Sequence, residues 1–237
     1  MGMRFFTGRR NREGPGTPAP QSGAALYFYL LGTYFWRFFW LGWLFLACCI
    51  PIVTIPAALT ALDRVMVKRI RERCVLFWAE YWTEFRRSFV KSLPMGVVFG
   101  GILVISYYLL SLGLTNQQNS FGLLFSGIGL CVLVIGSTWG AYAFVMLAAL
   151  ELPVGTLLRN AWYLMVLSGR YTFAVMATLV FSTVILLALF PMSLALVAFG
   201  WLAVTQYTVC WFVYQPVEDR IIRPFEKQNA EREEETV

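Results

Sequence analysis

The sequence contains no histidine, the side chain that most often serves as a general base or as a metal ligand in proteins. Its five cysteines do not take over that role. Cysteine occurs at positions 48, 49, 74, 131 and 210. The first two are adjacent, the third lies in a basic segment and the last two lie inside apolar runs, so no pair has the spacing of a metal site. We therefore expect no metal ion and no other cofactor, and we interpret the cysteines as small apolar side chains.

Sequence patterns of catalysis are also missing. The apolar runs contain no paired carboxylates, and the chain has no G-x-S-x-G turn and no glycine-rich phosphate loop. We expect that the protein is not an enzyme.

Charged residues are scarce, because they make up only 14% of the 237 residues while hydrophobic residues make up 59%. Soluble proteins carry about a quarter charged residues. The net charge is +6, and the basic residues lie between apolar runs, which is typical of segments that face an anionic lipid surface. The composition predicts an all-α, polytopic protein of the cell membrane, with the lipid bilayer as its main partner and no nucleic acid partner.

Short polar tails flank the predicted membrane domain. Residues 1–23 combine arginine with glycine, proline and serine, a composition that cannot bury enough apolar surface to fold by itself. Residues 216–237 end in a run of charged side chains and form the second tail. Residues 24–215 lie between the tails and form a single helical membrane domain.

The first apolar run contains two helix-breaking prolines. Over residues 24–62 only Arg37 is charged, and this run is longer than the roughly 20 residues that cross a bilayer. Pro51 and Pro56 each remove a backbone donor and clash with the preceding turn, so the segment has to pack against neighbouring helices. We expect Thr54 to supply a local hydrogen bond. Two structures fit this pattern: one kinked span, or a broken, re-entrant helix of the kind that lines transporter sites.

We expect about five transmembrane helices. They cover about 35–61, 94–114, 121–150, 171–190 and 194–215. Basic residues concentrate between the first two spans and after the last one, which predicts that these segments and the C-terminus are cytoplasmic. The arginines of the N-terminal tail conflict with this rule if the first segment crosses once, and a re-entrant first segment removes the conflict. The side of the N-terminus therefore remains open.

Two amphipathic helices are predicted on the cytoplasmic side, over about 63–92 and 156–168. In the first, aromatic residues recur at helical spacing along one face. They are Trp78, Trp82, Phe85 and Phe89. Charged residues, Glu80 and Glu84 among them, fall on the opposite face. The aromatic face either lies in the lipid interface or docks a partner protein, and the two uses are compatible.

Small and polar residues inside the spans indicate helix packing. Gly96 and Gly100 form one G-x-x-x-G motif, and Gly136 and Gly140 form another. Such motifs allow close backbone contact, either within one subunit or between the subunits of a homo-oligomer. Gln206 is the one strongly hydrogen-bonding side chain near the middle of a span, and it either joins two helices or lines a solute path. No Asp, Glu, Lys or Arg lies in the last four spans, so we do not expect a proton-coupled carrier.

Two neighbouring segments carry a resemblance to a known family. They are WLFLACCIPIVTIPAALTALDRVMVK (Trp43–Lys68) and FWAEYWTEFRRSFVKSL (Phe77–Leu93). The chain resembles the YesL family of bacterial membrane proteins, a family of unknown function, over roughly residues 35–215. Family members are often encoded beside carbohydrate uptake systems, so the resemblance implies an accessory component of an ABC-type sugar importer, without implying any catalytic or ligand residue.

Two functions therefore stand beside each other at this stage. In the first, the protein is a non-enzymatic helper that binds importer subunits through its cytoplasmic helices, with the aromatic face as the contact. In the second, it is a small-solute transporter or channel in its own right, as an oligomer, with the proline break and Gln206 lining the path.

Overall fold

The structure is a computed structural model, and it describes residues 23–72, 77–116, 120–150, 152–198 and 200–224. All regular structure in these residues is helical, which confirms the all-α part of the predicted fold class. The elements are α1 (Gly23–Cys48), η1 (Ile52–Thr54), α2 (Ile55–Glu72), α3 (Phe77–Thr115), α4 (Ser120–Ala149), α5 (Val154–Leu167), α6 (Gly169–Ala188), α7 (Ser193–Ala198), α8 (Trp201–Val217) and η2 (Glu218–Ile222). The predicted N-terminal tail up to residue 22, most of the C-terminal tail and Cys74 lie outside the described residues.

Four of the described helices are long and apolar enough to cross a membrane, which confirms a multi-pass membrane protein. They are α1, α3, α4 and α6. The predicted fifth span, about 194–215, is instead divided between α7 and α8. Gly200 separates the two helices with φ = +85°, a backbone conformation that ends an α-helix and that side chains other than glycine rarely adopt.

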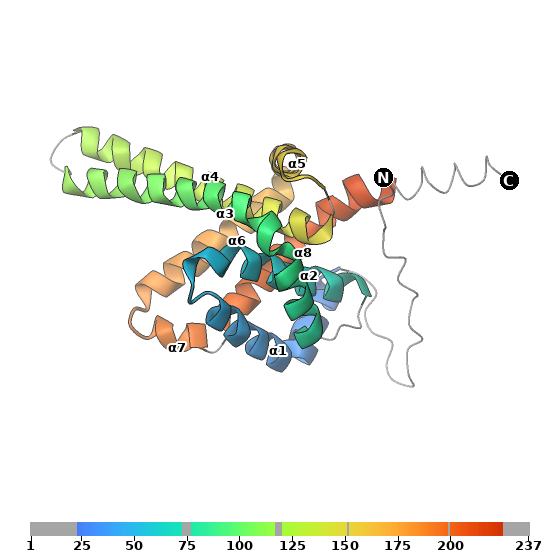
Figure 1. The fold of residues 1–237 in the computed structure, drawn as a ribbon. Helices are drawn as coiled ribbons and strands as arrows, with labels where there is room; N and C mark the ends of the chain where they lie inside the picture. The colour runs from blue at the N-terminus through green and yellow to red at the C-terminus, as the bar shows by residue number, and fades with distance from the viewer. Residues whose placement is uncertain (1–22, 73–76, 117–119, 151, 199, 225–237) are drawn as a thin grey trace.

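The first apolar run breaks at Pro51 and does not continue as one kinked helix. α1 ends at Cys48, and Figure 1 shows that α2 turns back alongside it, so the two helices form a hairpin. The Thr54 hydroxyl donates to the carbonyl oxygens of Cys48 and Pro51, each at 2.5 Å. This is the local hydrogen bonding expected of Thr54, and it satisfies carbonyl groups that the broken helix leaves open.

α2 lies at the centre of the bundle and contacts α1, α3, α4 and α8. Pro56 lies in the first turn of α2, where its missing N–H costs no helical hydrogen bond. Most of the helix is buried, and its most fully buried apolar residues include Ala57, Ala58, Ala61, Leu62, Val65 and Met66. Alanine at three of these positions lets the neighbouring helices approach the α2 backbone closely.

α3 combines the second part of the predicted interfacial helix and the predicted span that begins at residue 94 in one continuous helix. The expected interfacial helix over 63–92 is divided between the second half of α2 and the first half of α3. α3 then continues through Pro94 into the apolar span without a break. The Pro94 side chain is exposed, while Ser92 and Met95 beside it are buried, so packing on the other face of α3 holds the helix together across the proline.

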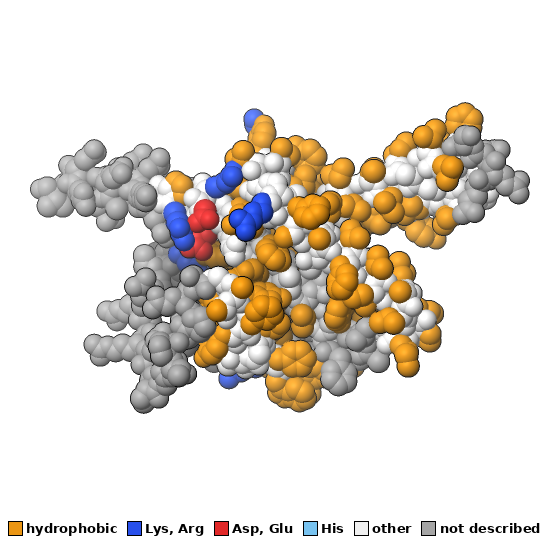
Figure 2. Space-filling view, turned by 180° about the vertical axis from the view of Figure 1, so that it is seen from behind, with side chains coloured by type: hydrophobic (Ala, Val, Ile, Leu, Met, Phe, Trp, Pro, Cys, Tyr) orange, Lys and Arg blue, Asp and Glu red, His pale blue; other side chains and the backbone are white. Residues whose placement is uncertain are grey.

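The hairpin of α3 and α4 extends away from the other helices in Figure 1. Its surface is strongly apolar, as expected for contact with lipid, and an apolar groove runs along α4 from Leu123 to Trp139, with Ile102 of α3 in its lining. Charged side chains are distributed very differently. In Figure 2, most of the visible Lys, Arg, Asp and Glu side chains gather toward one end, and hydrophobic side chains cover much of the remaining described surface.

Candidate functional site

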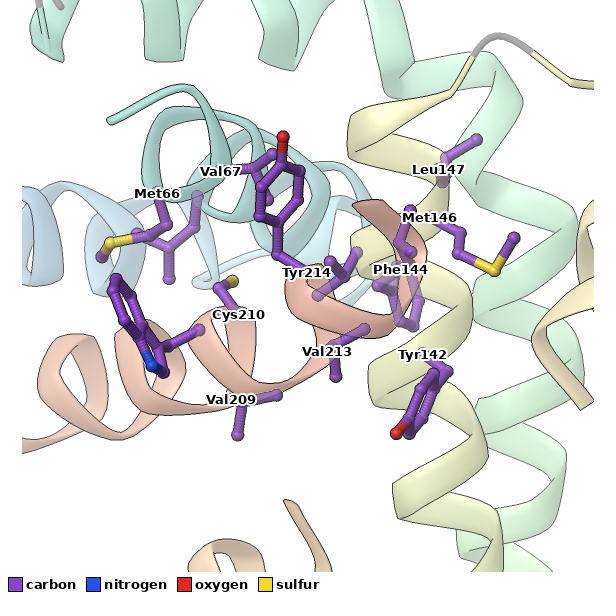
Figure 3. Packing of buried hydrophobic residues seen from close by; sticks show 14 of the residues in the cluster. Met66, Val67, Tyr142, Phe144, Met146, Leu147, Val209, Cys210, Val213 and Tyr214 are labelled. Atoms are coloured by element: carbon purple, nitrogen blue, oxygen red, sulfur yellow. The ribbon is translucent and has the colours of Figure 1, made fainter. Parts of the chain in front are cut away.

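A carboxyl group lies buried between two helices that are far apart in the sequence. Gln206 Nε2 donates to Asp63 Oδ1 at 2.5 Å, and Cys210 Sγ donates to the same oxygen at 3.3 Å. Gln206 and Cys210 are four residues apart on α8 and therefore share one face of that helix. Figure 3 shows Cys210 and Tyr214 pointing from α8 toward α2, the helix that carries Asp63.

Asp63 has an exposed fraction of 0%, and the surrounding side chains are mainly apolar. Leu62 and Met66 on the same helix and Cys210 on α8 are also fully or almost fully buried. Asp63 Oδ2 has no hydrogen-bond partner among the described residues. A charged carboxylate is costly to bury when one oxygen has no donor, so this environment favours the neutral acid.

The three basic residues nearest Asp63 on α2 are directed to other groups. Arg64 donates to the backbone carbonyl of Ala148 at the end of α4. Lys68 forms a salt bridge with Glu80 of α3, with 2.7 Å between Nζ and Oε1. The Arg69 guanidinium lies 3.4 Å from the centre of the Tyr34 ring. Within the described part of the chain, no salt bridge therefore compensates a charge on Asp63.

Burial raises the pKa of Asp63 from 3.8 to about 7, although the hydrogen bonds from Gln206 and Cys210 lower it. α2 is not one of the four apolar helices that can cross a membrane, and Asp63 lies near its middle. A carboxyl group with this pKa exchanges its proton near neutral pH. The site therefore has the chemistry of a proton acceptor and donor.

An aromatic cluster adjoins the buried carboxyl on the other side of α8. The Tyr27 hydroxyl and Thr208 Oγ1 lie 2.8 Å apart, which ties α1 to α8. The Tyr207 ring stacks on Tyr27 and on Phe38, with ring centres 5.2 and 5.0 Å apart. These contacts fix the rotation of α8 about its axis and so hold Gln206 toward α2.

The sequence pattern identified Gln206 but missed its partner. Asp63 lies at the start of the basic segment between the first two predicted spans, and the sequence pattern does not single it out. A better signal was available in the helical spacing, because Leu59 and Val67 lie four residues before and after Asp63 on the same face of α2. An acid between two apolar residues at that spacing belongs to a packed face.

The predicted aromatic face on the first half of α3 is only partly exposed. Trp78 and Trp82 have exposed fractions of 60% and 44%, whereas Phe85 and Phe89 are half-buried. Trp82 stacks on Phe85 with 5.5 Å between ring centres, and the Arg86 guanidinium lies 5.3 Å from the centre of the Trp82 ring. Trp82 is thus held by contacts with Phe85 and Arg86, and both tryptophans remain exposed.

The charged face opposite the aromatic residues is partly buried in the structure. Glu84 does not face solvent, because it is buried against the bundle and accepts a hydrogen bond of 2.7 Å from Ser88. Glu80 is half-buried and paired with Lys68 of α2. The cause is the position of α2, which packs along the face of α3 that carries these acids.

The glycine motifs contact other residues of the same chain. A Cβ atom at Gly96 would lie 2.2 Å from Pro56 Cγ, and one at Gly136 would lie 2.4 Å from Ile102 Cγ2. A Cβ atom at Gly140 would lie 3.2 Å from the Phe99 ring, also on α3. Gly100 has no neighbour within 4 Å of the corresponding position.

Residues 38–109 match the model of a family described as a protein of unknown function, DUF624. No curated protein and no solved structure matches the chain. The match agrees with the expectation of a family of unknown function, and the more specific resemblance to YesL stays a prediction.

The matched segment covers the proline break, all of α2 and most of α3. It therefore includes Asp63 and the exposed tryptophans, whereas Gln206 and Cys210 lie outside it. Among the residues described, no three His, Cys, Asp or Glu side chains lie close enough together to hold a metal ion.

Proposed function

We propose that this chain is a non-enzymatic protein of the bacterial cell membrane that binds the membrane subunits of an ABC-type carbohydrate importer. The observation that carries the proposal is the exposed pair Trp78 and Trp82 on the first half of α3. We choose a carbohydrate importer as the partner because of the resemblance to the YesL family. We choose the binding surface because of the arrangement of α3.

One face of this part of α3 is packed against the rest of the protein, whereas the face that carries the tryptophans is exposed. Tyr81, Glu84 and Ser88 are buried, and α2 packs against this helix. Trp78 and Trp82 add little to the core, yet Phe85 and Arg86 hold Trp82 in place. Ordered tryptophan and arginine side chains are the residues that most often dominate binding energy at protein interfaces.

The charge distribution supports a cytoplasmic position for this surface. Two groups of segments lie at opposite sides of Figure 1. Toward the right lie the end of α2, the start of α3 and the end of η2. Toward the left lie the α1–α2 turn and the α6–α7 turn. Basic residues belong to the first group of segments, while residues 49–54 and 189–192 carry no charge. By the positive-inside rule the right-hand end is cytoplasmic, together with the C-terminus and the tryptophan pair.

Site-specific photo-crosslinking in native membranes tests the proposal. A photoreactive amino acid replaces Trp82, and in a second variant it replaces Trp36. Trp36 is a matched control because its exposed fraction of 64% is close to that of Trp78, but it lies on α1. We expect a crosslink from position 82 to an importer membrane subunit and none from position 36.

Alanine variants measure how much the pair contributes. Trp78→Ala with Trp82→Ala should reduce co-purification of importer subunits by at least about tenfold, since tryptophans at an interface centre are worth about 2 kcal/mol or more. Trp36→Ala should leave it unchanged at equal expression. Crosslinks from position 82 to lipid alone would contradict the proposal and would assign the tryptophans to the membrane interface.

A further inference from the structure

The geometry points to Asp63 as a proton-binding site, at which uptake and release of one proton control the contact between α2 and α8. This inference does not depend on the importer partner, because it uses a different part of the molecule. Its basis is one carboxyl group that is fully buried, receives hydrogen bonds from a distant helix on one oxygen, and has no partner on the other.

The observed contacts fit the neutral acid better than the anion. Asp63 Oδ1 accepts from the Gln206 amide and the Cys210 thiol in either state. In the neutral acid, Oδ2 carries the proton and the group has no net charge. In the anion, Oδ2 retains negative charge in an apolar environment with no donor, which is costly. Release forms a carboxylate and a free proton that passes to water, so the step needs no other reactant.

In the described part of the chain, α1, α4 and α8 place no positively charged side chain beside Asp63. From α8 the Cys210 thiol and the Tyr214 side chain point toward α2, beside the neutral Gln206. α4 contains no Asp, Glu, Lys or Arg, and the single charged residue of α1, Arg37, lies over the rings of Tyr34 and Phe77 at 5.4 and 5.6 Å.

The remaining charged neighbours of Asp63 belong to α2 itself and to α3. On α2 they are Arg64, Lys68 and Arg69, whose contacts with Ala148, Glu80 and Tyr34 are described above. On α3 the acids facing α2 are Glu80 and Glu84, which bond to Lys68 and Ser88. The pKa near 7 that burial produces is consistent with this absence of compensating charge.

Loss of the proton should weaken the packing of α2 on α8. An anion at this position is stabilised only if water or a new donor reaches Oδ2, and both require the two helices to separate locally. The neutral state keeps them closed. Proton binding thus selects between a closed and a looser contact at the centre of the bundle.

Infrared difference spectroscopy of the full chain in lipid vesicles tests whether the proton is bound. We expect a carbonyl stretch of a protonated carboxylic acid that disappears as the pH rises through about 7. The band should be absent in Asp63→Asn and retained in Asp219→Asn, which removes an exposed acid. Absence of the band in the wild type below neutral pH, or its persistence in Asp63→Asn, would overturn the proposal.

A second variant keeps the test decisive if Asp63→Asn does not fold. Gln206→Leu removes a donor that favours the carboxylate, so the midpoint at which the band disappears should move to higher pH. An unchanged midpoint would show that the titrating acid is elsewhere.

Hydrogen exchange tests the structural consequence. At about pH 8.5, amides of α2 and α8 should exchange at least about tenfold faster in the wild type than in Asp63→Asn, and at about pH 5.5 the two proteins should exchange equally. Comparison at the same pH cancels the intrinsic effect of pH on exchange. Equal rates at both pH values would contradict the link between the proton and the helix contact.

Discussion

Replacement of Asp63 by asparagine should stabilise the protein, and the effect should grow with pH. Asparagine has nearly the same shape as the neutral acid, and its side-chain oxygen can still accept from Gln206 and Cys210. It cannot ionise. The variant therefore remains in the equivalent of the protonated state at every pH, whereas the wild-type carboxyl becomes a buried anion.

The magnitude follows from the pKa of the buried group. The folded state raises this pKa from 3.8 to about 7, so the folded protein holds the proton more tightly than the unfolded chain. The resulting stabilisation is fully present below about pH 4, declines as the pH rises, and is lost above about pH 7. Each pKa unit corresponds to about 1.4 kcal/mol, so the loss amounts to about 4 kcal/mol.

Denaturant unfolding in detergent micelles across the pH range measures this difference. The free energy of unfolding of the wild type should fall between about pH 4 and pH 7 relative to that of Asp63→Asn, and the gap should then stay constant near 4 kcal/mol. Asp219→Asn should follow the wild-type curve. Parallel curves for wild type and Asp63→Asn, or a wild type that gains stability over this range, would refute the reasoning.

Three further predictions concern packing and local bonds. Gly96→Ala should lower the free energy of unfolding by about 1–3 kcal/mol, because its new methyl group meets a rigid proline ring of α2, whereas Gly100→Ala should not; thermal unfolding in detergent distinguishes the two. Thr54→Val should cost about 1 kcal/mol in the same assay and Thr54→Ser much less, since serine keeps the hydroxyl that closes the turn. A double-mutant cycle on Lys68 and Glu80 should give a coupling below about 1 kcal/mol, as both side chains are partly solvated. A coupling of several kcal/mol would mean that this pair is effectively buried.

The apolar helices and an interruption near Pro51 could be predicted from the sequence because both depend on local properties, but the sequence left open whether the helix kinks or breaks there. A long apolar segment has to form a helix in lipid, and a proline interrupts that helix whatever its tertiary surroundings are. The number of spans was harder to predict. Gly200 adopts a left-handed backbone conformation, and a Cβ atom there would lie 3.2 Å from the backbone of Phe39 on α1, a contact that no local pattern in residues 194–215 contains.

The buried carboxyl could not be predicted with the same reasoning, because its environment is created by helices far away in the sequence. Asp63 and Glu84 both lie among basic residues, which normally indicates a solvated helix face. The hairpin of α1 and α2 instead brings α2 into the centre, where it covers the acidic face of α3 and receives α8. Which helix covers which face is a tertiary property, and periodicity along one helix does not report it.

The tip of the α1–α2 hairpin has a consequence for biogenesis. Ile50 and Ile52 have exposed fractions of 82% and 81%, and no charged side chain occurs between Cys48 and Asp63. When this tip enters the hydrocarbon, no hydrophilic loop has to cross to the far leaflet. The two helices can therefore enter the bilayer together, with the burial of the exposed isoleucines as the driving force.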